Sequence, residues 1–276
     1  MKIALIGYGK MGKAIHEMAL QKNEINRNNN AILSAQIKSM DSTDKIANDK
    51  NTRLGRNEFD IALIVDVDNR LTVTKEELQQ VDVAIEFTSP HTAVENIQWC
   101  FDAGVPVVVG STGWTDKLDE IKEYARQNDK SFLFAPNFSI GVNIFFEVNR
   151  YLAQIMNHHD EYDVTLEEIH HTEKKDAPSG TALHAALDIL KRLERKTDWK
   201  NGDTDKTEIV SIISKREENV PGTHVVTYES SIDKIELTHI AHNRKGFAGG
   251  ALLAAEWLVG KKGAFSMEDV LGFNTH

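Results

Sequence analysis

The sequence predicts an α/β fold, with an open parallel sheet in the first half of the chain and a smaller α+β domain in the second. Short apolar runs in the first half, such as 61–65, contain no polar alternation, which is typical of strands covered on both faces by helices. After residue 137 the strand candidates alternate, as 162–169 does, and follow one another closely, which favours an antiparallel or mixed sheet. A length of 276 residues allows one large domain or two ordinary ones, and the change of pattern after residue 137 favours two.

The first half alternates between strand and helix. Strands are predicted at 3–6, 61–65, 81–87, 105–109 and 131–134, and helices at 13–22, 90–103 and 116–128. Between the first helix and the second strand, residues 25–57 are polar and rich in asparagine, so we expect most of this stretch to be a surface insertion. Within it, 31–37 is expected to form a short strand or a helical turn.

The second half combines long helices with neighbouring strands. Helices are predicted at 141–156, 181–193 and 247–258, and strands at 162–169, 209–214, 223–230 and 234–241. We therefore expect a first domain over 1–138, a second over 139–243, and a segment 244–276 whose helix returns to the first domain.

Composition excludes several classes of protein. Lys and Arg number 32 against 42 Asp and Glu, a formal net charge of −10, and so acidic a chain is a poor candidate for binding nucleic acid. No apolar run approaches the ~18 residues of a membrane helix, and the apolar start, 1–7, is too short for a secretory signal, so a cytoplasmic location is expected. The single cysteine, Cys100, excludes an internal disulfide and a multi-thiolate metal site, and its apolar helical setting predicts core packing.

A glycine-rich turn follows the first predicted strand and opens a predicted helix. The match to G-x-G-x-x-G is made by Gly7, Tyr8, Gly9, Lys10, Met11 and Gly12. In such a turn the first glycine allows the tight bend, the second lets a pyrophosphate approach the backbone, and the third lets helix and strand pack closely. The first domain is therefore predicted to be of the Rossmann type and to bind a dinucleotide cofactor.

An acid at the end of the second strand normally binds the ribose of such a cofactor, about 20 residues after the glycines. The best candidate here is Asp66, which comes later because the expected insertion precedes its strand; Asp68 is second and Asp41 third. An acid repels a 2′-phosphate and favours NADH over NADPH, although Lys10 and Arg70 could partly counter this. NADH is the expected cofactor, and NADPH stays open.

Two further strand ends carry small polar residues. The segments are Phe87-Thr88-Ser89-Pro90 and Gly110-Ser111-Thr112-Gly113. Ligands of open parallel sheets bind beyond the carboxyl ends of the strands, so these segments are expected to extend the cofactor site. The alternative interpretation is ordinary turn chemistry, since these residue types all favour turns.

The densest polar stretch of the chain is 167–181. A strand there ends in His170 and His171, a loop brings Lys174, and Ser179, Gly180 and Thr181 begin a helix whose free N–H groups form a seat for an anion. Neighbouring residues of a strand face opposite ways, so both histidines reach one ligand only if the strand ends between them, as we expect. The same argument disfavours a metal site of His170, His171 and Glu173, and no metal is expected.

From His170 through Thr181 the chain reads H-H-x-x-K-x-D-A-P-S-G-T, and this signature resembles the 4-hydroxy-tetrahydrodipicolinate reductase (dihydrodipicolinate reductase) family. Further matching stretches are 7–12, 110–113, 135–143 and 216–224, with Thr238, His239 and Arg244 near the end. The resemblance implies a homotetrameric reductase of the diaminopimelate route to lysine, in which NADH or NADPH reduces a small cyclic dicarboxylic imine with loss of water. The second domain would then serve substrate binding and oligomerisation.

The resemblance also assigns roles to residues. His170 is the implied proton donor or acceptor and Lys174 the proton donor, while His171, Gly180 and Thr181 hold the substrate carboxylates. Cofactor contacts are implied for the 7–12 turn, Asp66, Gly110, Ser111, Thr112, Ala135, Pro136, Asn137, Phe138 and Arg244. Two alternatives stay open: another NAD(P)-dependent dehydrogenase on the same two-domain plan, which would not explain 170–181, and a nucleotide sensor without activity, which would not need the histidines and Lys174.

Overall fold

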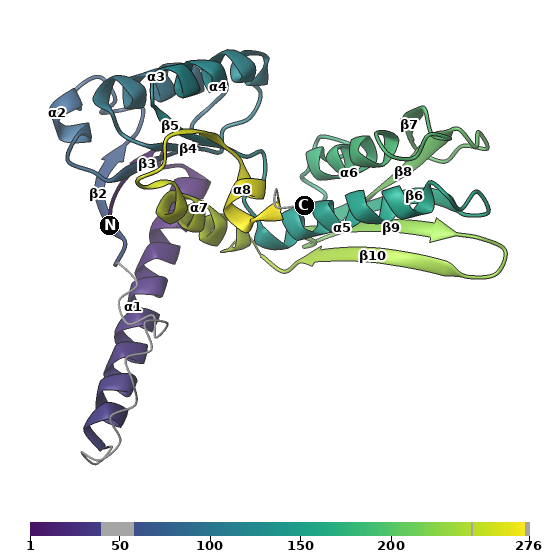
Figure 1. Cartoon of the computed structure of the whole chain (residues 1–276), viewed down its shortest axis with the longest axis horizontal. Helices are drawn as coiled ribbons and strands as arrows, with labels where there is room; N and C mark the ends of the chain where they lie inside the picture. The colour runs from purple at the N-terminus through teal and green to yellow at the C-terminus, as the bar shows by residue number, and fades with distance from the viewer. Residues whose placement is uncertain (40–57, 244, 274–276) are drawn as a thin grey trace. The chain divides into compact units, whose positions relative to one another are not determined.

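The computed structural model describes residues 1–39, 58–243 and 245–273 (Figure 1). These residues divide into two compact units. Unit 1 combines 1–136 with 248–270, and unit 2 consists of 137–247 with the last residues from 271 on. Among the described residues, none of the helices combines the length and the apolar composition that crossing a membrane requires.

Unit 1 is built on a six-stranded sheet in which every neighbouring pair of strands is parallel. In sheet order the strands are β11 (Gly263–Phe265), β5 (Ser131–Phe134), β4 (Val107–Val109), β3 (Val83–Glu86), β1 (Lys2–Ile6) and β2 (Asp60–Val65). Because β1 lies between β2 and β3, the chain leaves β1 first to one side and then to the other. Such a switch point opens a crevice at the carboxyl ends of the strands, and the predicted α/β fold with a parallel sheet is confirmed.

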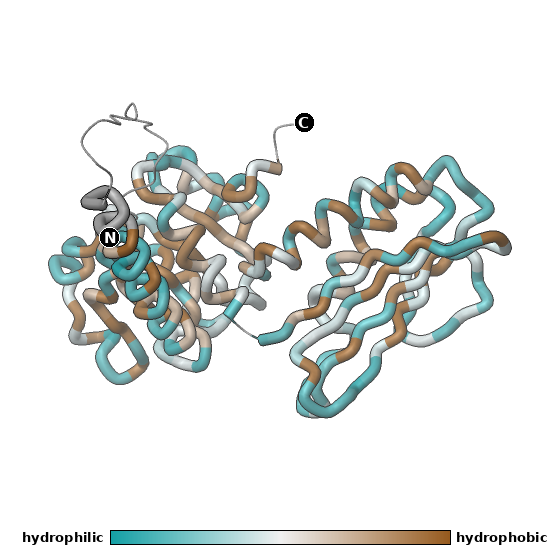
Figure 2. The backbone as a smooth tube through the Cα atoms, turned by 90° about the horizontal axis from the view of Figure 1, so that it is seen from below, coloured by the Kyte–Doolittle hydropathy of each residue, from teal (hydrophilic) through white to brown (hydrophobic). Residues whose placement is uncertain are grey.

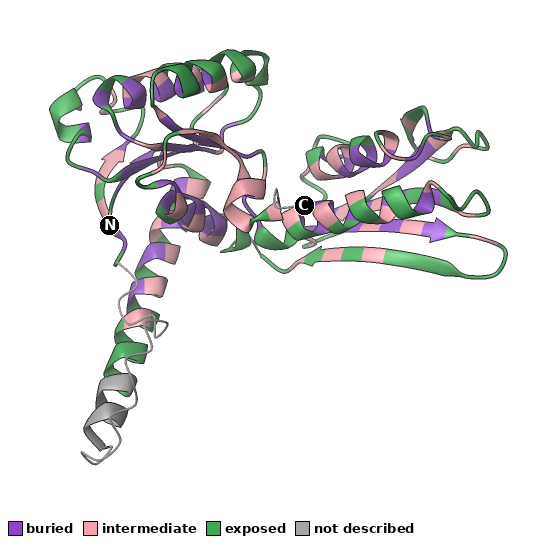
Figure 3. Ribbon diagram, viewed as in Figure 1, coloured by how far each residue is buried: buried purple, intermediate pink, exposed green. Residues whose placement is uncertain are grey.

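Helices cover both faces of this sheet (Figure 1). They are α1 (Lys10–Ser39), α2 (Lys75–Leu78), α3 (Ala93–Ala103), α4 (Leu118–Gln127) after a short 3₁₀ turn (Thr115–Lys117), α7 (Lys245–Leu258) and α8 (Met267–Leu271). Figure 1 shows α3 and α4 on one side of the sheet and α1 and α7 on the other. Every residue of β3, β4 and β5 is buried, which explains why their sequences do not alternate (Figure 3).

The first helix differs from the sequence prediction. Instead of ending near residue 22, α1 continues to Ser39, so 25–39 is helix rather than an inserted loop. This stretch contains no glycine or proline, and its asparagines each cost only a few tenths of a kcal/mol in a helix. Asn23 and Phe59 exchange two hydrogen bonds of 2.8 Å between side chain and backbone, which tie the helix to the start of β2. The rest of the expected insertion, 40–57 with Asp41, lies outside the described residues.

Unit 2 contains a five-stranded mixed sheet with two helices packed against each other. Its strands in sheet order are β10 (Lys234–Ala241), β9 (Gly222–Glu229), β6 (Asp163–His170), β8 (Ile209–Arg216) and β7 (Asp198–Asn201). The central strand β6 pairs antiparallel with β9 and parallel with β8. The helices are α5 (Ile140–Met156) and α6 (Gly180–Leu190), and their apolar side chains pack against alternate residues of β6, β8 and β9 in the core. Figure 2 shows hydrophobic and hydrophilic residues alternating along strands of this sheet.

Candidate active site

The glycine-rich turn after β1 has the geometry that the motif requires. Gly7 has φ of +95°, and a Cβ atom there would lie 2.2 Å from the Phe87 carbonyl oxygen. A Cβ atom on Gly12 would lie 2.2 Å from the Gly7 carbonyl oxygen, so close packing demands glycine at both positions. By contrast, a Cβ atom on Gly9 would meet nothing within 4 Å. The middle glycine therefore faces open space at the start of α1, where a phosphate group would fit.

Two adjoining cavities lie at the carboxyl ends of the unit 1 strands. The larger, of about 460 Å³, is lined among others by Gly7, Gly9, Asp66, Arg70, Phe87 and Thr88. The smaller, of about 350 Å³, is lined by Lys10, Met11, Gly110, Ser111 and Thr112, and shares Gly9, Phe87, Thr88 and Ser89 with the larger. Most of the predicted cofactor residues thus line one continuous track. Tyr8 and Gly12 do not line it: the Tyr8 hydroxyl hydrogen-bonds to His16 Nδ1 at 2.7 Å, and Gly12 shapes the turn.

The structure separates the three candidate acids. Asp66 lines the larger cavity, whereas Asp68 does not and Asp41 lies outside the described residues. The basic residue of this cavity is Arg70, whose Cζ lies over the Trp99 ring at 3.9 Å from its centroid. The guanidinium also donates to Asn96 Oδ1 at 3.0 Å and lies 3.8 Å from Glu95. Arg70 is therefore already engaged by the protein at the edge of the cavity.

Sequence reasoning missed a buried acid beneath the track. Glu86 ends β3, is fully buried, and accepts hydrogen bonds from the Thr88 backbone N–H at 3.1 Å and from the Thr88 hydroxyl. Burial raises the pKa of Glu86 despite these bonds. The Thr88 N–H also donates to Ser111 Oγ at 2.8 Å, so this network joins the loops that follow β3 and β4. The sequence did contain a signal for this residue, because Glu86 is an acid inside the predicted strand 81–87.

The chain passes from unit 1 to unit 2 within the predicted cofactor residues 135–138. Ala135 belongs to unit 1 and its N–H bonds the Val109 carbonyl at 3.3 Å, and Pro136 is exposed. Asn137 and the buried Phe138 begin unit 2, where the Asn137 side chain accepts from the Ser139 N–H at 2.9 Å. Arg244 lies outside the described residues.

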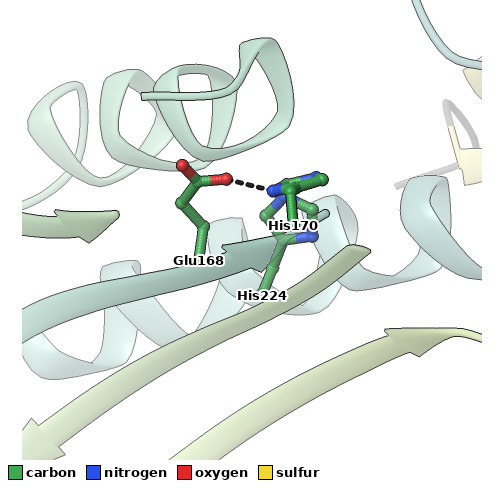
Figure 4. Close-up of side chains that lie close together, drawn as sticks. All are labelled: Glu168, His170 and His224. Atoms are coloured by element: carbon green, nitrogen blue, oxygen red, sulfur yellow. Dashed lines mark ion pairs between the residues drawn. The ribbon is translucent and has the colours of Figure 1, made fainter. Parts of the chain in front are cut away.

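In unit 2, the alternation of β6 places Glu168 and His170 on the same, buried side of the sheet. His170 Nδ1 and the Glu168 carboxylate are in direct contact (Figure 4). Glu168 also accepts from Arg216 Nη1 at 3.0 Å. Burial alone would raise the pKa of Glu168, but the hydrogen bonds from His170 and Arg216 outweigh it and lower the pKa to about 2. A buried carboxylate is thus held ionised between two cationic or proton-donating partners.

A second histidine completes this cluster. His224 lies on β9 directly opposite Glu168, and its ring centroid is 5.1 Å from that of His170 (Figure 4). His224 Nε2 hydrogen-bonds to Ser179 Oγ at 3.1 Å, and Ser179 caps α6 by accepting from the Ala182 N–H, also at 3.1 Å. Burial, assisted by the charge of His170, lowers the pKa of His224 to about 3, so its ring is neutral near pH 7. The start of α6 therefore lies next to His170.

Arg216 also arranges the loop that carries Lys174. Its guanidinium donates to the Asp176 carbonyl at 2.7 Å and to the Lys174 carbonyl at 3.3 Å. Lys174 Nζ contacts both carboxylate oxygens of Asp176, at 2.9 and 2.8 Å, and this bond lowers the pKa of Asp176. The strand ends at His170 as predicted, so His171 turns to a cavity of about 400 Å³ that it lines with Thr172, Glu173, Glu218 and Asn219.

Glu168, His170 and His224 place one ligand atom each within 4.8 Å of one another, a set that could hold a metal ion. This set differs from the metal site of His170, His171 and Glu173 that the sequence disfavoured, because His171 lies beyond the end of β6. Since Arg216 and His170 already engage the Glu168 carboxylate, we interpret the cluster as acid–base machinery. Glu168 was not singled out from the sequence, although the period of β6 puts it on the His170 face. Arg216 and His224 were noted only as the ends of a stretch that resembles the family, without a role.

The parallel sheet with its glycine turn, together with the separate acid–base cluster of unit 2, defines an NAD(P)H-dependent oxidoreductase. The chain belongs to the dihydrodipicolinate reductase family: the model of the family's N-terminal part matches residues 1–138 and that of its C-terminal part residues 141–271. The match over both halves of the chain favours a reductase over the two alternatives that the sequence left open.

Similar proteins agree with this assignment. The chain is 44% identical over 271 residues to a 4-hydroxy-tetrahydrodipicolinate reductase of Christiangramia forsetii, covering 98% of both chains. It is 39% identical over 214 residues to one from Methanosarcina barkeri, covering 76% of this chain and 79% of the other. A solved structure of dipicolinate-bound dihydrodipicolinate reductase from Paenisporosarcina sp. TG-14 has the same fold, with a TM-score of 0.67, 21% identity and 98% of both chains covered.

Proposed function

We propose that this chain reduces 4-hydroxy-tetrahydrodipicolinate to tetrahydrodipicolinate, with loss of water, in the biosynthesis of diaminopimelate and lysine. The observation that carries the proposal is the match to 4-hydroxy-tetrahydrodipicolinate reductases over 98% of the chain, through the cofactor track of unit 1 and the acid–base cluster of unit 2 alike. A match limited to the glycine turn would leave the acid–base cluster of unit 2 unexplained.

The residues of unit 1 suit a nicotinamide dinucleotide, which when bound supplies a hydride. Open space at Gly9 and the free N–H groups of the first turn of α1 accommodate a pyrophosphate. Asp66 in the larger cavity is suited to accept hydrogen bonds from ribose hydroxyls.

The same cavity supports a preference for NADH. Its charged lining consists of Asp66 and Glu95 against Arg70, whose guanidinium is occupied by Trp99, Asn96 and Glu95. An acidic balance beside the ribose disfavours the extra 2′-phosphate of NADPH. Val67 follows Asp66, so no arginine stands there to receive that phosphate.

The residues of unit 2 suit a small dicarboxylate. The Ser179 cap leaves the N–H groups of Gly180 and Thr181 at the positive end of α6 available to a carboxylate, and His171 is a further donor for the substrate. Reduction of a conjugated imine builds negative charge away from the carbon that receives the hydride. His170 and Lys174 are the groups that stabilise this charge and move protons.

The resemblance to the family also leads us to propose a cytoplasmic homotetramer. Light scattering on the purified protein tests this assembly, with four times 31.0 kDa as the expected mass. A monomeric or dimeric mass would contradict it.

The activity is tested with a coupled assay. The purified protein is mixed with dihydrodipicolinate synthase, the substrates of that synthase and either NADH or NADPH, and the loss of reduced nicotinamide is followed by absorbance. We expect loss only when the synthase and both of its substrates are present, and a higher kcat/KM with NADH than with NADPH. A rate no faster than in the absence of the protein would overturn the proposed function.

A further inference from the structure

We propose that Glu168 is a positioning residue, which Arg216 holds ionised so that it fixes His170 in the tautomer with a proton on Nδ1 and an open Nε2. The inference rests on the proposed function only for the proton-transfer role of His170. Its structural content, the tautomer, is independent of catalysis.

The positions of these side chains follow from the register of the sheet. Glu168 and His170 are two residues apart on β6, so the strand period directs both toward the same face, where Glu168 is fully buried and His170 is 8% exposed. Arg216 is the partner of His170 on the neighbouring strand β8. The three side chains therefore converge because of backbone geometry, and not because a mobile loop brings them together.

The charge of Glu168 decides which nitrogen of His170 carries the proton. The ionised carboxylate accepts from Arg216 with Oε1 and contacts His170 Nδ1 with Oε2. A carboxylate without a proton can only accept, so His170 Nδ1 must be the donor. In the neutral ring Nε2 is then the unprotonated nitrogen and is available to take up a proton.

Space around Nε2 leaves this nitrogen accessible for proton transfer. A Cβ atom at Gly222 would lie 3.0 Å from His170 Nε2, so glycine at this position keeps the nitrogen clear of side-chain atoms. The neighbouring His224 is neutral near pH 7 because burial depresses its pKa, and it places no second positive charge beside a protonated His170. Arg216, Lys174 and His239 are the other charged or titratable groups nearby.

Replacing the carboxylate by an amide tests the inference without changing the shape of the side chain. Glu168→Gln retains a single acceptor oxygen, which the Arg216 guanidinium takes because a charged donor forms the stronger bond. The amide NH₂ group then faces His170 Nδ1, which must accept, and the ring proton moves to Nε2. In the Ser-His-Asp triad of serine proteases, the corresponding change of Asp to Asn lowers kcat by roughly four orders of magnitude, because the histidine then adopts the wrong tautomer.

The experiment compares wild type, Glu168→Gln and Glu167→Gln by ¹⁵N NMR of histidine-labelled full-length protein, with the His170 signals identified by their loss in His170→Gln. Glu167 is the matched control, because it is the neighbouring acid on β6 but points to the opposite side and pairs with Lys215 at 2.5 Å. We expect His170 to be protonated at Nδ1 in wild type and in Glu167→Gln, and at Nε2 in Glu168→Gln.

Steady-state kinetics give a second measurement. The expected result is a kcat for Glu168→Gln that is roughly 10²- to 10⁴-fold below wild type, with KM for NADH within about twofold, since Glu168 lies in unit 2. Protonation at Nε2 in wild type would overturn the inference even if the glutamine variant failed to fold. An unchanged tautomer in a folded Glu168→Gln protein would also overturn it. If the wild-type protein shows no activity, the proposed function is refuted, and the NMR experiment still determines the tautomer of His170.

Discussion

Replacing His224 by glutamine is predicted to make the stability of the protein less sensitive to mild acid. The His224 side chain is 4% exposed and its pKa is lowered to about 3 by burial, next to His170, Glu168, His239 and Lys174. In the unfolded chain an imidazole has a pKa of about 6.5. Between these two pKa values the imidazole therefore binds a proton in the unfolded state but not in the folded state. The stability associated with neutral His224 is fully present above about pH 6.5 and is lost as the pH falls toward 3.

The magnitude follows from the two pKa values. Between about pH 7 and pH 5 the unfolded imidazole becomes almost fully protonated while His224 in the folded protein stays neutral, which removes about 2 kcal/mol from the free energy of unfolding. This figure does not depend on the exact value for the folded protein, provided that it lies well below 5, as about 3 does. Because the side chain is buried, solvent screening does not reduce it.

Urea unfolding of wild type and His224→Gln near pH 7 and near pH 5, at one protein concentration, measures this effect. Glutamine is chosen because its amide can still bond Ser179, and only the pH dependence is compared, so a general loss of stability does not matter. We expect the drop in stability between the two pH values to be about 2 kcal/mol smaller in the variant. An equal drop in both proteins, or an NMR signal of His224 that titrates near pH 6.5, would refute the reasoning.

The remaining predictions concern the cofactor turn and the site residues. Gly12→Ala places a Cβ atom 2.2 Å from the Gly7 carbonyl oxygen, so we expect weaker NADH binding by titration and roughly 1–3 kcal/mol lower stability, while Gly249→Ala, in a helix with no atom within 4 Å of the new Cβ, should be harmless. Lys174→Ala should lower kcat by roughly 10²-fold or more with little change in the dissociation constant of NADH, and an unchanged kcat would remove Lys174 from the mechanism. Asp66→Ala should weaken NADH more than NADPH, and equal effects on both would point to Asp68 or Asp41 instead.

The strands of unit 1 were readable from the sequence because burial on both faces leaves only apolar residues, as in β5, predicted and observed at 131–134. Short elements could not be predicted from the sequence. The four residues of α2 and the three of β11 are too few to show a period. The length of α1 was underestimated because an exposed helix of polar residues shows no apolar face, and residues 27–32 are all exposed.

The candidate site divides in the same way. The glycine turn and 170–181 are local in sequence, so residue types and spacing indicated them directly. The choice of Asp66 over Asp68 as the acid that lines the cavity depends on how the chain turns after β2, where the Asp66 side chain accepts from the Val67 N–H and its backbone N–H bonds Asn69. A difference of two residues in an exposed loop is not visible in composition or period.

By itself the sequence determined the α/β class, the dinucleotide turn and the family, because each depends on residue types that lie close together along the chain. Only the tertiary structure decided that the buried residues Glu168, His170 and His224 form one cluster, which the partly exposed Arg216 joins. These residues come from three strands, and their contacts arise from the pairing of β6 with β8 on one side and β9 on the other. Strand register sets which side chains face each other, and it is a property of the folded sheet that no local sequence pattern contains.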